Sequence, residues 1–297
     1  MRSTLLLALN PSIDVEWLVE NVLWEEKNDV RSERRWAGGK GINVARWLKH
    51  LGGNPQLILP LGGKAGSELA GFLRDERIPA RIIRLREATR ANVIVTTASR
   101  RQMRFNAPGP KLSRREWESV LKVVESRLAR TELLILSGSL PRGVPRTAYA
   151  QLIKCAHRFG VKTLLDCDGP AFAAAIKSRP FLVKPNEHEL AQWWGRELRG
   201  EAKLVSAAGA LSKQTGSWVL VSRGAKRSLL VNRRKGFREF TKPPRAKPRN
   251  TVGAGDAMLA AVARQIACGA PPRDWLRQGT VVGTAATQCL PGRLPSY

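Results

Sequence analysis

The chain has 297 residues, 43% of them hydrophobic, and its 51 lysines and arginines outnumber 24 acidic residues to give a formal charge of +27. This length supports one large α/β domain or two modest ones. The four cysteines are far apart and form no CxxC or Cys/His cluster, which argues against a zinc site or a redox pair. No stretch approaches the ~20 apolar residues of a membrane span, so we expect a soluble, cytoplasmic protein with reduced thiols.

The positive charge requires either an anionic partner or a highly solvated surface. It is spread over the whole chain, with one dense patch at residues 233–249, "RRKGFREFTKPPRAKPR". No helix-turn-helix, RNP-like or zinc-finger pattern accompanies it, so the sequence does not favour nucleic-acid binding beyond a non-specific attraction. A phosphorylated substrate is the other anionic partner that the charge suits.

Short apolar runs alternate with amphipathic ones along the chain. The apolar runs predict strands at 4–9, 55–61, 131–137, 161–167, 180–185, 218–223 and 228–232. The amphipathic runs predict helices at 41–52, 67–76, 115–129, 148–160, 188–195, 207–216 and 257–269. This alternation is typical of a mainly parallel sheet with helices on its faces. Segments 14–36 and 83–105 break the rhythm and predict extended strands in a small β appendage.

A glycine-rich turn with one carboxylate, "NTVGAGDAM" at 250–258, runs directly into the last of these helices. Its glycines allow backbone N–H groups to gather at the start of the helix, where the helix dipole favours negative charge. Asp256 stands at the edge of this anion cradle and could take a proton from an attacking hydroxyl. An ordinary helix cap is the alternative interpretation of this aspartate.

A second glycine cluster, "AGGKGINVARWL" at 37–48, also precedes a predicted helix. It places Lys40 and Asn43 where they could hold sugar hydroxyls and phosphate. The GxxxxGK(S/T) spacing of a Walker A loop is absent.

Together, these two stretches resemble the two signatures of the ribokinase-like carbohydrate kinases, in particular the PfkB branch with its 1-phosphofructokinases, tagatose-6-phosphate kinases and minor 6-phosphofructokinases. Further similar motifs occur in order: "LNPSID" at 9–14, "TRANV" at 89–93, "LSGSLPRGVP" at 136–145, "KPNEHEL" at 184–190 and "VSRGA" at 221–225. The resemblance covers essentially the whole chain. It implies a three-layer αβα body with a mainly parallel sheet and a small β lid, so residues 1–297 are expected to form a single kinase domain with lid segments at about 14–36 and 83–105.

The resemblance also implies roles for individual residues. Asp256 matches the catalytic base, and Gly253, Ala254 and Gly255 match the anion hole. The positions that match the sugar site are Asp14, Gly38, Gly39, Lys40 and Asn43, and those that match contacts to an existing sugar phosphate are Arg90 and Ser139. The nucleotide side is matched by Lys184, Asn186, Ser222, Gly224 and Thr251.

Asn186 and Glu189 match an NxxE element that orders Mg²⁺ and its waters around ATP. An amide oxygen and a carboxylate one helical turn apart suit a hard, hydrated ion. An asparagine cap followed by an exposed glutamate is the alternative interpretation. His50, His157 and His188 have no ligand or triad spacing.

Some positions depart from the family pattern. Asp29 stands in a lid strand where phosphosugar kinases tend to have arginine, with Lys27 or Arg31 as possible replacements. Arg227 replaces a usual glycine in the nucleotide loop, which predicts an altered contact on the adenine side. Cys167 and Asp168 replace a commoner Thr-Ser type pair, and the sequence ends before the expected terminal helix.

From these features we expect an ATP- and Mg²⁺-dependent kinase that phosphorylates a phosphorylated ketohexose. Fructose 1-phosphate, giving fructose 1,6-bisphosphate, is the first choice, with fructose 6-phosphate and tagatose 6-phosphate as alternatives. A homodimer through the β lid is expected, because two strands alone would leave unpaired edges. The alternative of another class is a catalytically degenerate protein that binds nucleic acid.

Overall fold

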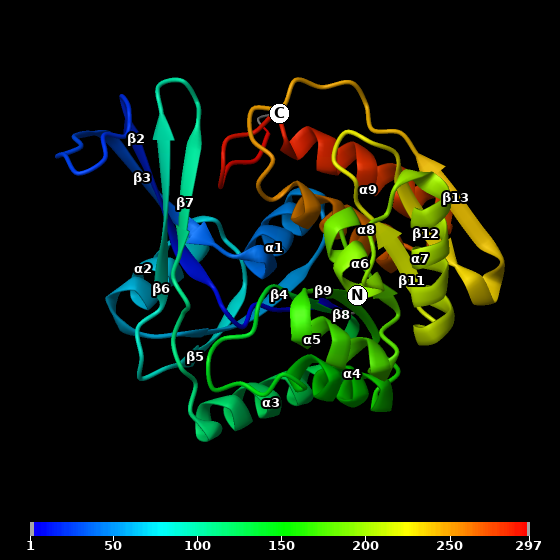
Figure 1. The fold of residues 1–297 in the computed structure, drawn as a ribbon. Helices are drawn as coiled ribbons and strands as arrows, with labels where there is room; N and C mark the ends of the chain where they lie inside the picture. Colours follow the sequence, from blue (N-terminus) through cyan, green and yellow to red (C-terminus); the bar gives the residue numbers. More distant parts are fainter. Residues whose placement is uncertain (1–2, 296–297) are drawn as a thin grey trace.

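A large central sheet organises the computed structural model, which describes residues 3–295. Within those residues the sheet has nine strands in the order β13-β12-β11-β10-β9-β8-β1-β4-β5 (Figure 1). Their bounds are β1 Ser3–Leu7, β4 Pro55–Leu61, β5 Ala80–Arg84, β8 Thr131–Ser137, β9 Lys162–Asp166, β10 Leu182–Val183, β11 Trp218–Val221, β12 Ser228–Asn232 and β13 Phe237–Thr241. The strands from β5 to β11 pair in parallel, and β12 and β13 are added antiparallel.

Helices cover both faces of this sheet (Figure 1). One layer consists of α3 Arg114–Leu128, α4 Ala148–Arg158, α5 Gly169–Ala175, α6 Glu187–Trp194 and α7 Gly200–Thr215. The other consists of α1 Lys40–His50, α2 Gly63–Asp75, α8 Ala254–Ala267 and α9 Pro272–Ala286. The described part of the body also has two short 3₁₀ turns, η1 Ile176–Ser178 and η2 Arg233–Lys235.

The central strands are apolar on both sides because each face packs on a helix layer. In β1, Leu5 and Leu7 belong to the core cluster of the first layer, while Leu6 belongs to that of the second. This alternation follows from the period of two in a strand. It explains why unbroken apolar runs in the sequence correctly predicted the central strands.

A separate sheet forms the lid at one side of the body (Figure 1). It consists of β2 Ser12–Val19, β3 Val30–Gly38, β6 Arg90–Thr97 and β7 Gln102–Asn106, in the order β3-β2-β6-β7. The expected α/β class, with its ribokinase-like body and β lid, is confirmed. The second lid segment begins at Arg90 rather than near residue 83, because residues 80–84 form β5 at the edge of the main sheet.

The sequence patterns failed to predict four elements, namely β5, α5, α9 and β13. The alternating polar residues of β13, "FREFT", were attributed to a basic patch, and α9 contains Gly279 and Gly283, which weaken a helical pattern. After α9, residues 287–295 form no further helix. Among the described residues, no helix combines the length and apolar character needed to cross a membrane.

Candidate active site

A cavity of about 1130 Å³ lies at the carboxyl ends of the parallel strands and extends to the lid. It brings together every predicted site residue except Gly38, which lies behind Asp14. Ligand sites in open α/β sheets occur at this edge, where loops follow the strands. The sequence motifs that are far apart along the chain therefore converge on one site.

Two of the helices that begin at this cavity, α1 and α8, each follow a glycine with positive φ. Gly253 caps α8 with φ 79°, and Gly39 caps α1 with φ 107°, in conformations that favour glycine. The first N–H groups of a helix lie ahead of its regular hydrogen-bond ladder. Here Ile42 N donates to the carbonyl of Gly39 at 3.0 Å, and Ala254 N makes a long bond of 3.5 Å to the carbonyl of Thr251. The start of α8, predicted as an anion cradle, faces into the cavity with Ala254, Gly255 and Asp256.

Asp256 is the buried carboxylate of this cradle, with 6% of its surface exposed. Burial, reinforced by the negative charge of Asp166, raises the pKa of Asp256 to about 7. Asn43 Nδ2 donates a hydrogen bond of 2.9 Å to Asp256 Oδ2, which opposes this rise. A carboxylate with this pKa is suited to accept a proton near neutral pH.

A buried arginine fixes the orientation of Asn43. Arg46 Nη1 donates to Asn43 Oδ1 at 3.0 Å, so the amide NH₂ is turned toward Asp256. Arg46 is itself held by a bidentate pair with Glu76 and by a 2.9 Å bond from its Nη2 to the carbonyl of Ala37. This chain of hydrogen bonds from Glu76 through Arg46 and Asn43 to Asp256 was not apparent from the sequence, although Arg46 lies within the second glycine motif.

Asp14 lies on the lid strand β2 and points into the cavity. Its Oδ1 accepts hydrogen bonds from Ser12 Oγ at 2.7 Å and Asn92 Nδ2 at 3.0 Å. Burial raises the pKa of Asp14, and these bonds and the charge of Arg90 partly offset the rise. The carboxylate is thus held in a fixed position at the cavity wall, and Asn92 is a further cavity residue that the sequence did not reveal.

Arg90 and Ser139 meet near the start of the lid through Asn10. Arg90 donates to the carbonyls of Ala107 and Asn10, each at 2.8 Å, and Asn10 Nδ2 donates to Ser139 Oγ at 3.1 Å. The Nε of Arg90 is buried with no hydrogen-bond partner in the described residues. These groups line the same end of the cavity as Asp14 and Asn92.

Asp166, at the end of β9, forms a charge cluster with two lysines. Its carboxylate lies 3.2 Å from both Lys40 Nζ and Lys184 Nζ. Lys40 Nζ is also 3.9 Å from Glu189, and the nearby carboxylates raise its pKa, with Asp166 contributing most. Lys40, expected to contact the sugar, therefore lies toward the predicted nucleotide side. Asp166 was missed, although a carboxylate at the end of a predicted parallel strand is a usable signal.

Asn186 and Glu189 form a reciprocal capping box at the start of α6. Asn186 Oδ1 accepts from Glu189 N at 2.8 Å, and Glu189 Oε2 accepts from Asn186 N at 2.9 Å. Glu189 Oε1 makes only the longer contact with Lys40, and Asp166 Oδ2 has only its ion-pair contact with Lys184 in the described chain. Carboxylate oxygens beside an anion cradle fit a hydrated Mg²⁺ bound with a polyphosphate.

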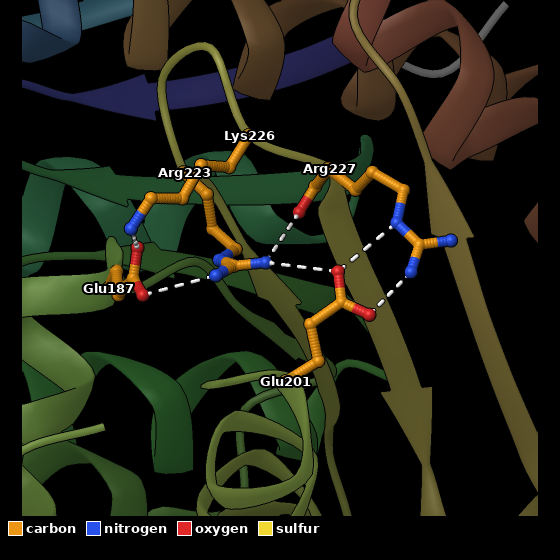
Figure 2. Close-up of polar contacts among 5 residues, drawn as sticks. All are labelled: Glu187, Glu201, Arg223, Lys226 and Arg227. Carbon is orange, nitrogen blue, oxygen red and sulfur yellow. Dashed lines mark hydrogen bonds and ion pairs between the residues drawn. The ribbon is translucent and has the colours of Figure 1, made fainter. Parts of the chain in front are cut away.

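The loop after β11 is tied to α6 and α7 by an ion-pair network (Figure 2). Arg223, whose side chain is 5% exposed, lies 3.2 Å from Glu187 and 3.6 Å from Glu201. Arg227 pairs with Glu201 and stacks on Phe240, with its guanidinium 4.8 Å from the ring centre. Arg223 lines the cavity and Arg227 does not. The unusual arginine at 227 therefore lies on the side of the loop that faces away from the cavity, where it pairs with Glu201.

Comparison with known proteins places this chain in a family. Residues 8–295 match the model of the pfkB family carbohydrate kinases. The chain is 34% identical over 294 residues to ATP-dependent 6-phosphofructokinase isozyme 2 of Escherichia coli, covering 98% of this chain and 94% of that protein. It is 35% identical to 1-phosphofructokinase of Xanthomonas campestris, covering 95% and 89% of the two chains.

The crystal structure of phosphofructokinase-2 from Escherichia coli in complex with potassium superposes with a TM-score of 0.92 and 34% identity, over 100% of this chain and 96% of that one. The chain belongs to the pfkB family of carbohydrate kinases. The predicted relationship to the 6-phosphofructokinases and 1-phosphofructokinases is confirmed, as is the expected class of enzyme, an ATP-dependent sugar kinase.

The network in Figure 2 leads to a paired prediction about ATP. Arg223→Leu is expected to raise the KM for ATP about tenfold, because it leaves Glu187 and Glu201 without their buried partner and loosens the loop that faces the cavity. Arg227→Gly, which removes a half-exposed ion pair, is expected to change this KM less than about twofold. Steady-state kinetics at saturating sugar test both variants, and equal effects of the two would contradict this assignment.

Proposed function

We propose that this kinase transfers the γ-phosphoryl group of ATP to a hydroxyl of a phosphorylated ketohexose. The observation that carries the proposal is a buried carboxylate with a pKa of about 7, Asp256, placed in the first turn of a helix whose start lines the same cavity as Asp14 and Arg90. An anion cradle beside a proton acceptor is what phosphoryl transfer to a hydroxyl needs.

In the proposed mechanism, Asp14 and Asn43 orient the sugar ring from the two sides of the cavity. Asp256 accepts the proton of the attacking hydroxyl, and the N–H groups at the start of α8 stabilise the charge on the transferring group. Lys184 and Lys40, both beside Asp166, supply positive charge for the ATP phosphates. The loop at Ser222, Gly224 and Thr251 completes the nucleotide side.

Asn186, Glu189 and Asp166 are proposed to hold Mg²⁺ together through water molecules. Bound with ATP, the ion would supply positive charge to the phosphates. Glu189 Oε1 and the second lone pair of Asn186 Oδ1 could take up water while the capping box of α6 stays intact.

Fructose 6-phosphate is the first proposed substrate, with fructose 1,6-bisphosphate as the product. The support is the likeness to 6-phosphofructokinase isozyme 2 over nearly the whole chain. Fructose 1-phosphate, the first choice from the sequence alone, stands second, because a relative of similar identity bears the name 1-phosphofructokinase. Tagatose 6-phosphate is the third candidate, from the family resemblance.

A coupled assay of ADP release with the three sugar phosphates tests this proposal. We expect turnover with at least one of them, dependent on ATP and Mg²⁺, with the highest kcat/KM for fructose 6-phosphate. Preference for fructose 1-phosphate or tagatose 6-phosphate would reassign the substrate. Absence of turnover together with tight, salt-sensitive nucleic-acid binding would favour the degenerate binding protein instead.

We further propose that residues 1–297 act as a single kinase domain in the cytoplasm and pair with a second copy through the lid. The lid exposes Leu18, Trp24 and Phe105, and β3 and β7 form its two edges in the described sheet. Exposed apolar side chains on a small sheet with open edges favour burial against a partner. A solution mass of one chain at micromolar concentration would contradict the dimer.

A further inference from the structure

The side chain of Arg46 joins three elements around the candidate active site. Arg46 lies in α1 and is buried, with 5% of its surface exposed. Its Nη1 donates to Asn43, one turn earlier in α1, and its Nη2 donates to the carbonyl of Ala37 in the lid strand β3. Its Nε and Nη2 also bind the two carboxylate oxygens of Glu76, the C-cap of α2, at 2.6 and 2.8 Å. Each of the three guanidinium nitrogens therefore makes a hydrogen bond.

The end of α2 holds this guanidinium in a fixed plane. An arginine and a carboxylate that share two parallel hydrogen bonds have a defined relative orientation. Glu76 is itself anchored a second time, because Lys49 Nζ of α1 donates to its backbone carbonyl at 2.6 Å. The direction in which Nη1 of Arg46 points is thus set by the packing of α1 on α2.

The bond to Ala37 places Arg46 close to the lid residue Asp14. Ala37 pairs in register with Ile13, the neighbour of Asp14 in β2, and both are fully buried. A second cavity of about 40 Å³ is lined by Asp14 and Asn43, which also line the main cavity, and by Arg46, which does not. Burial raises the pKa of Asp14, and the positive charge of Arg46 is one of the interactions that oppose this rise. Arg46 thus lies behind both walls of the site without reaching its ligand space.

The orientation of the Asn43 amide decides what Asp256 meets. An asparagine amide presents an acceptor oxygen on one side and a donor NH₂ on the other, and the two have similar shapes. Because Oδ1 of Asn43 accepts from Arg46, the NH₂ faces Asp256 and donates to its Oδ2. The reverse orientation would bring an oxygen against the carboxylate and repel it. Arg46 therefore selects the orientation that holds Asp256.

We propose that Arg46 is a positioning residue that aligns Asn43 with Asp256 and ties this alignment to the lid strand β3 and the end of α2. Because one guanidinium makes all three contacts, a displacement of β3 disturbs the bond to Asn43 as well. The position of the lid and the alignment of the base are thus coupled. This inference rests on the proposed function and names the residue that sets the orientation of its base.

Kinetics of Arg46→Met test this role. We expect kcat/KM for the preferred sugar phosphate to fall about 30-fold, as for loss of one hydrogen bond to a charged group, while the KM for ATP stays within about twofold. The matched control is Arg35→Met, which removes another bidentate pair between β3 and α2, with Glu68 at 2.6 and 2.9 Å, that lines neither cavity. This control should change kcat/KM less than about twofold.

A double-mutant cycle separates positioning from a general effect on the fold. In the Asn43→Ala background, Arg46→Met should lower kcat/KM less than about threefold further, because no amide is left to orient. The full 30-fold loss in both backgrounds would overturn the assignment, as would an unchanged kcat/KM in Arg46→Met or an equal loss in Arg35→Met. If Arg46→Met does not fold, Glu76→Gln replaces it, with an expected loss of about fivefold and the same criteria.

Carboxyl ¹³C NMR measures the alignment without turnover. Burial and Asp166 raise the pKa of Asp256, whereas the groups that lower it are Asn43, Lys40 and Lys184. Of these, only Asn43 is hydrogen-bonded to Arg46 in the described residues. In protein labelled at the aspartate carboxyl carbons, the signal that is missing from Asp256→Asn belongs to Asp256. Its titration midpoint should rise by about half to one pH unit in Arg46→Met, and by less in Glu76→Gln, and should stay in place in Arg35→Met.

This measurement distinguishes the inference from the proposed function. A midpoint that rises in Arg46→Met but not in Arg35→Met supports the positioning role even if the unchanged protein phosphorylates none of the three sugar phosphates, in which case only the proposed function fails. A midpoint that is the same in Arg46→Met as in the unchanged protein would overturn the positioning role, whatever the turnover.

Discussion

Replacing Asp256 by asparagine is expected to lower kcat by about 10³-fold, while the affinity for ATP stays within about twofold. Asparagine preserves the shape of the side chain and the contact with Asn43, but it cannot accept a proton. General-base catalysis contributes roughly 10²–10⁴ to enzymatic rates, and phosphoryl transfer depends further on positioning. Single-turnover kinetics and nucleotide titration measure the two effects separately. A variant that kept most of its rate would place the proton acceptor elsewhere.

The pH dependence of kcat/KM in the unchanged enzyme is expected to follow the ionisation of Asp256. Because burial and Asp166 raise the pKa of Asp256 to about 7, the carboxylate is largely protonated below that pH. We expect kcat/KM for the sugar phosphate to fall about tenfold for each pH unit below 7 and to level off above it. A flat profile from pH 5 to 8 would contradict this account of the base.

Stability should change in the opposite direction to activity. The pKa of Asp256 is higher in the folded protein than its usual value of 3.8, so the folded state binds this proton more tightly than the unfolded chain. The contribution of this group to stability is thus greatest below about pH 4 and is lost as the pH rises through 7. Asp256→Asn should therefore raise the free energy of unfolding at pH 8, by up to about 4 kcal/mol, and by less as the pH falls.

Replacing Gly38 by alanine is expected to lower kcat/KM for the sugar at least about 100-fold. A Cβ at Gly38 would lie 2.2 Å from Cγ and Oδ2 of Asp14, far inside contact distance. The carboxylate would have to leave its bonds with Ser12 and Asn92, and with them its position toward the sugar. Asp14 would then lose the two charge-assisted hydrogen bonds that it could accept from sugar hydroxyls. At about 1.5–3 kcal/mol each, these bonds account for an effect of this size.

The matched control is Gly71→Ala on α2, where the nearest atom to an added Cβ is 3.8 Å away on Arg74. It should leave kinetics unchanged. A double-mutant cycle gives the sharper test, because Gly38→Ala should add almost nothing to the loss already caused by Asp14→Ala. Additive losses would show that Gly38→Ala acts through the fold and not through Asp14.

The α/β body was predictable because its parallel strands are buried on both faces and its helices follow in alternation. The run Leu5 to Leu7 and the pattern after Gly39 each specify their element locally. Elements at the margins were less predictable. β5 alternates with charged residues because it is an edge strand, and its membership of the main sheet depends on pairing with β4, which no local pattern reveals.

The candidate site was predictable where a motif imposes backbone geometry. Gly253 and Gly39 need positive φ before a helix, so glycine turns disclosed both helix N-termini. Residues that act through tertiary contact left no such signal. Arg46 meets Asn43 and Glu76 only when α1 packs in the fold. The roles of the individual residues stay predictions.

Transfer of label from ATP carrying ³²P in its γ-phosphate tests most directly the central claim that the start of α8 and Asp256 move a phosphoryl group to a sugar hydroxyl. With fructose 6-phosphate and Mg²⁺, the account predicts label in a sugar bisphosphate, and labelling about 10³-fold slower with Asp256→Asn although ATP still binds. Label that stays in ATP or appears only as inorganic phosphate, with each of the three sugar phosphates, would contradict it.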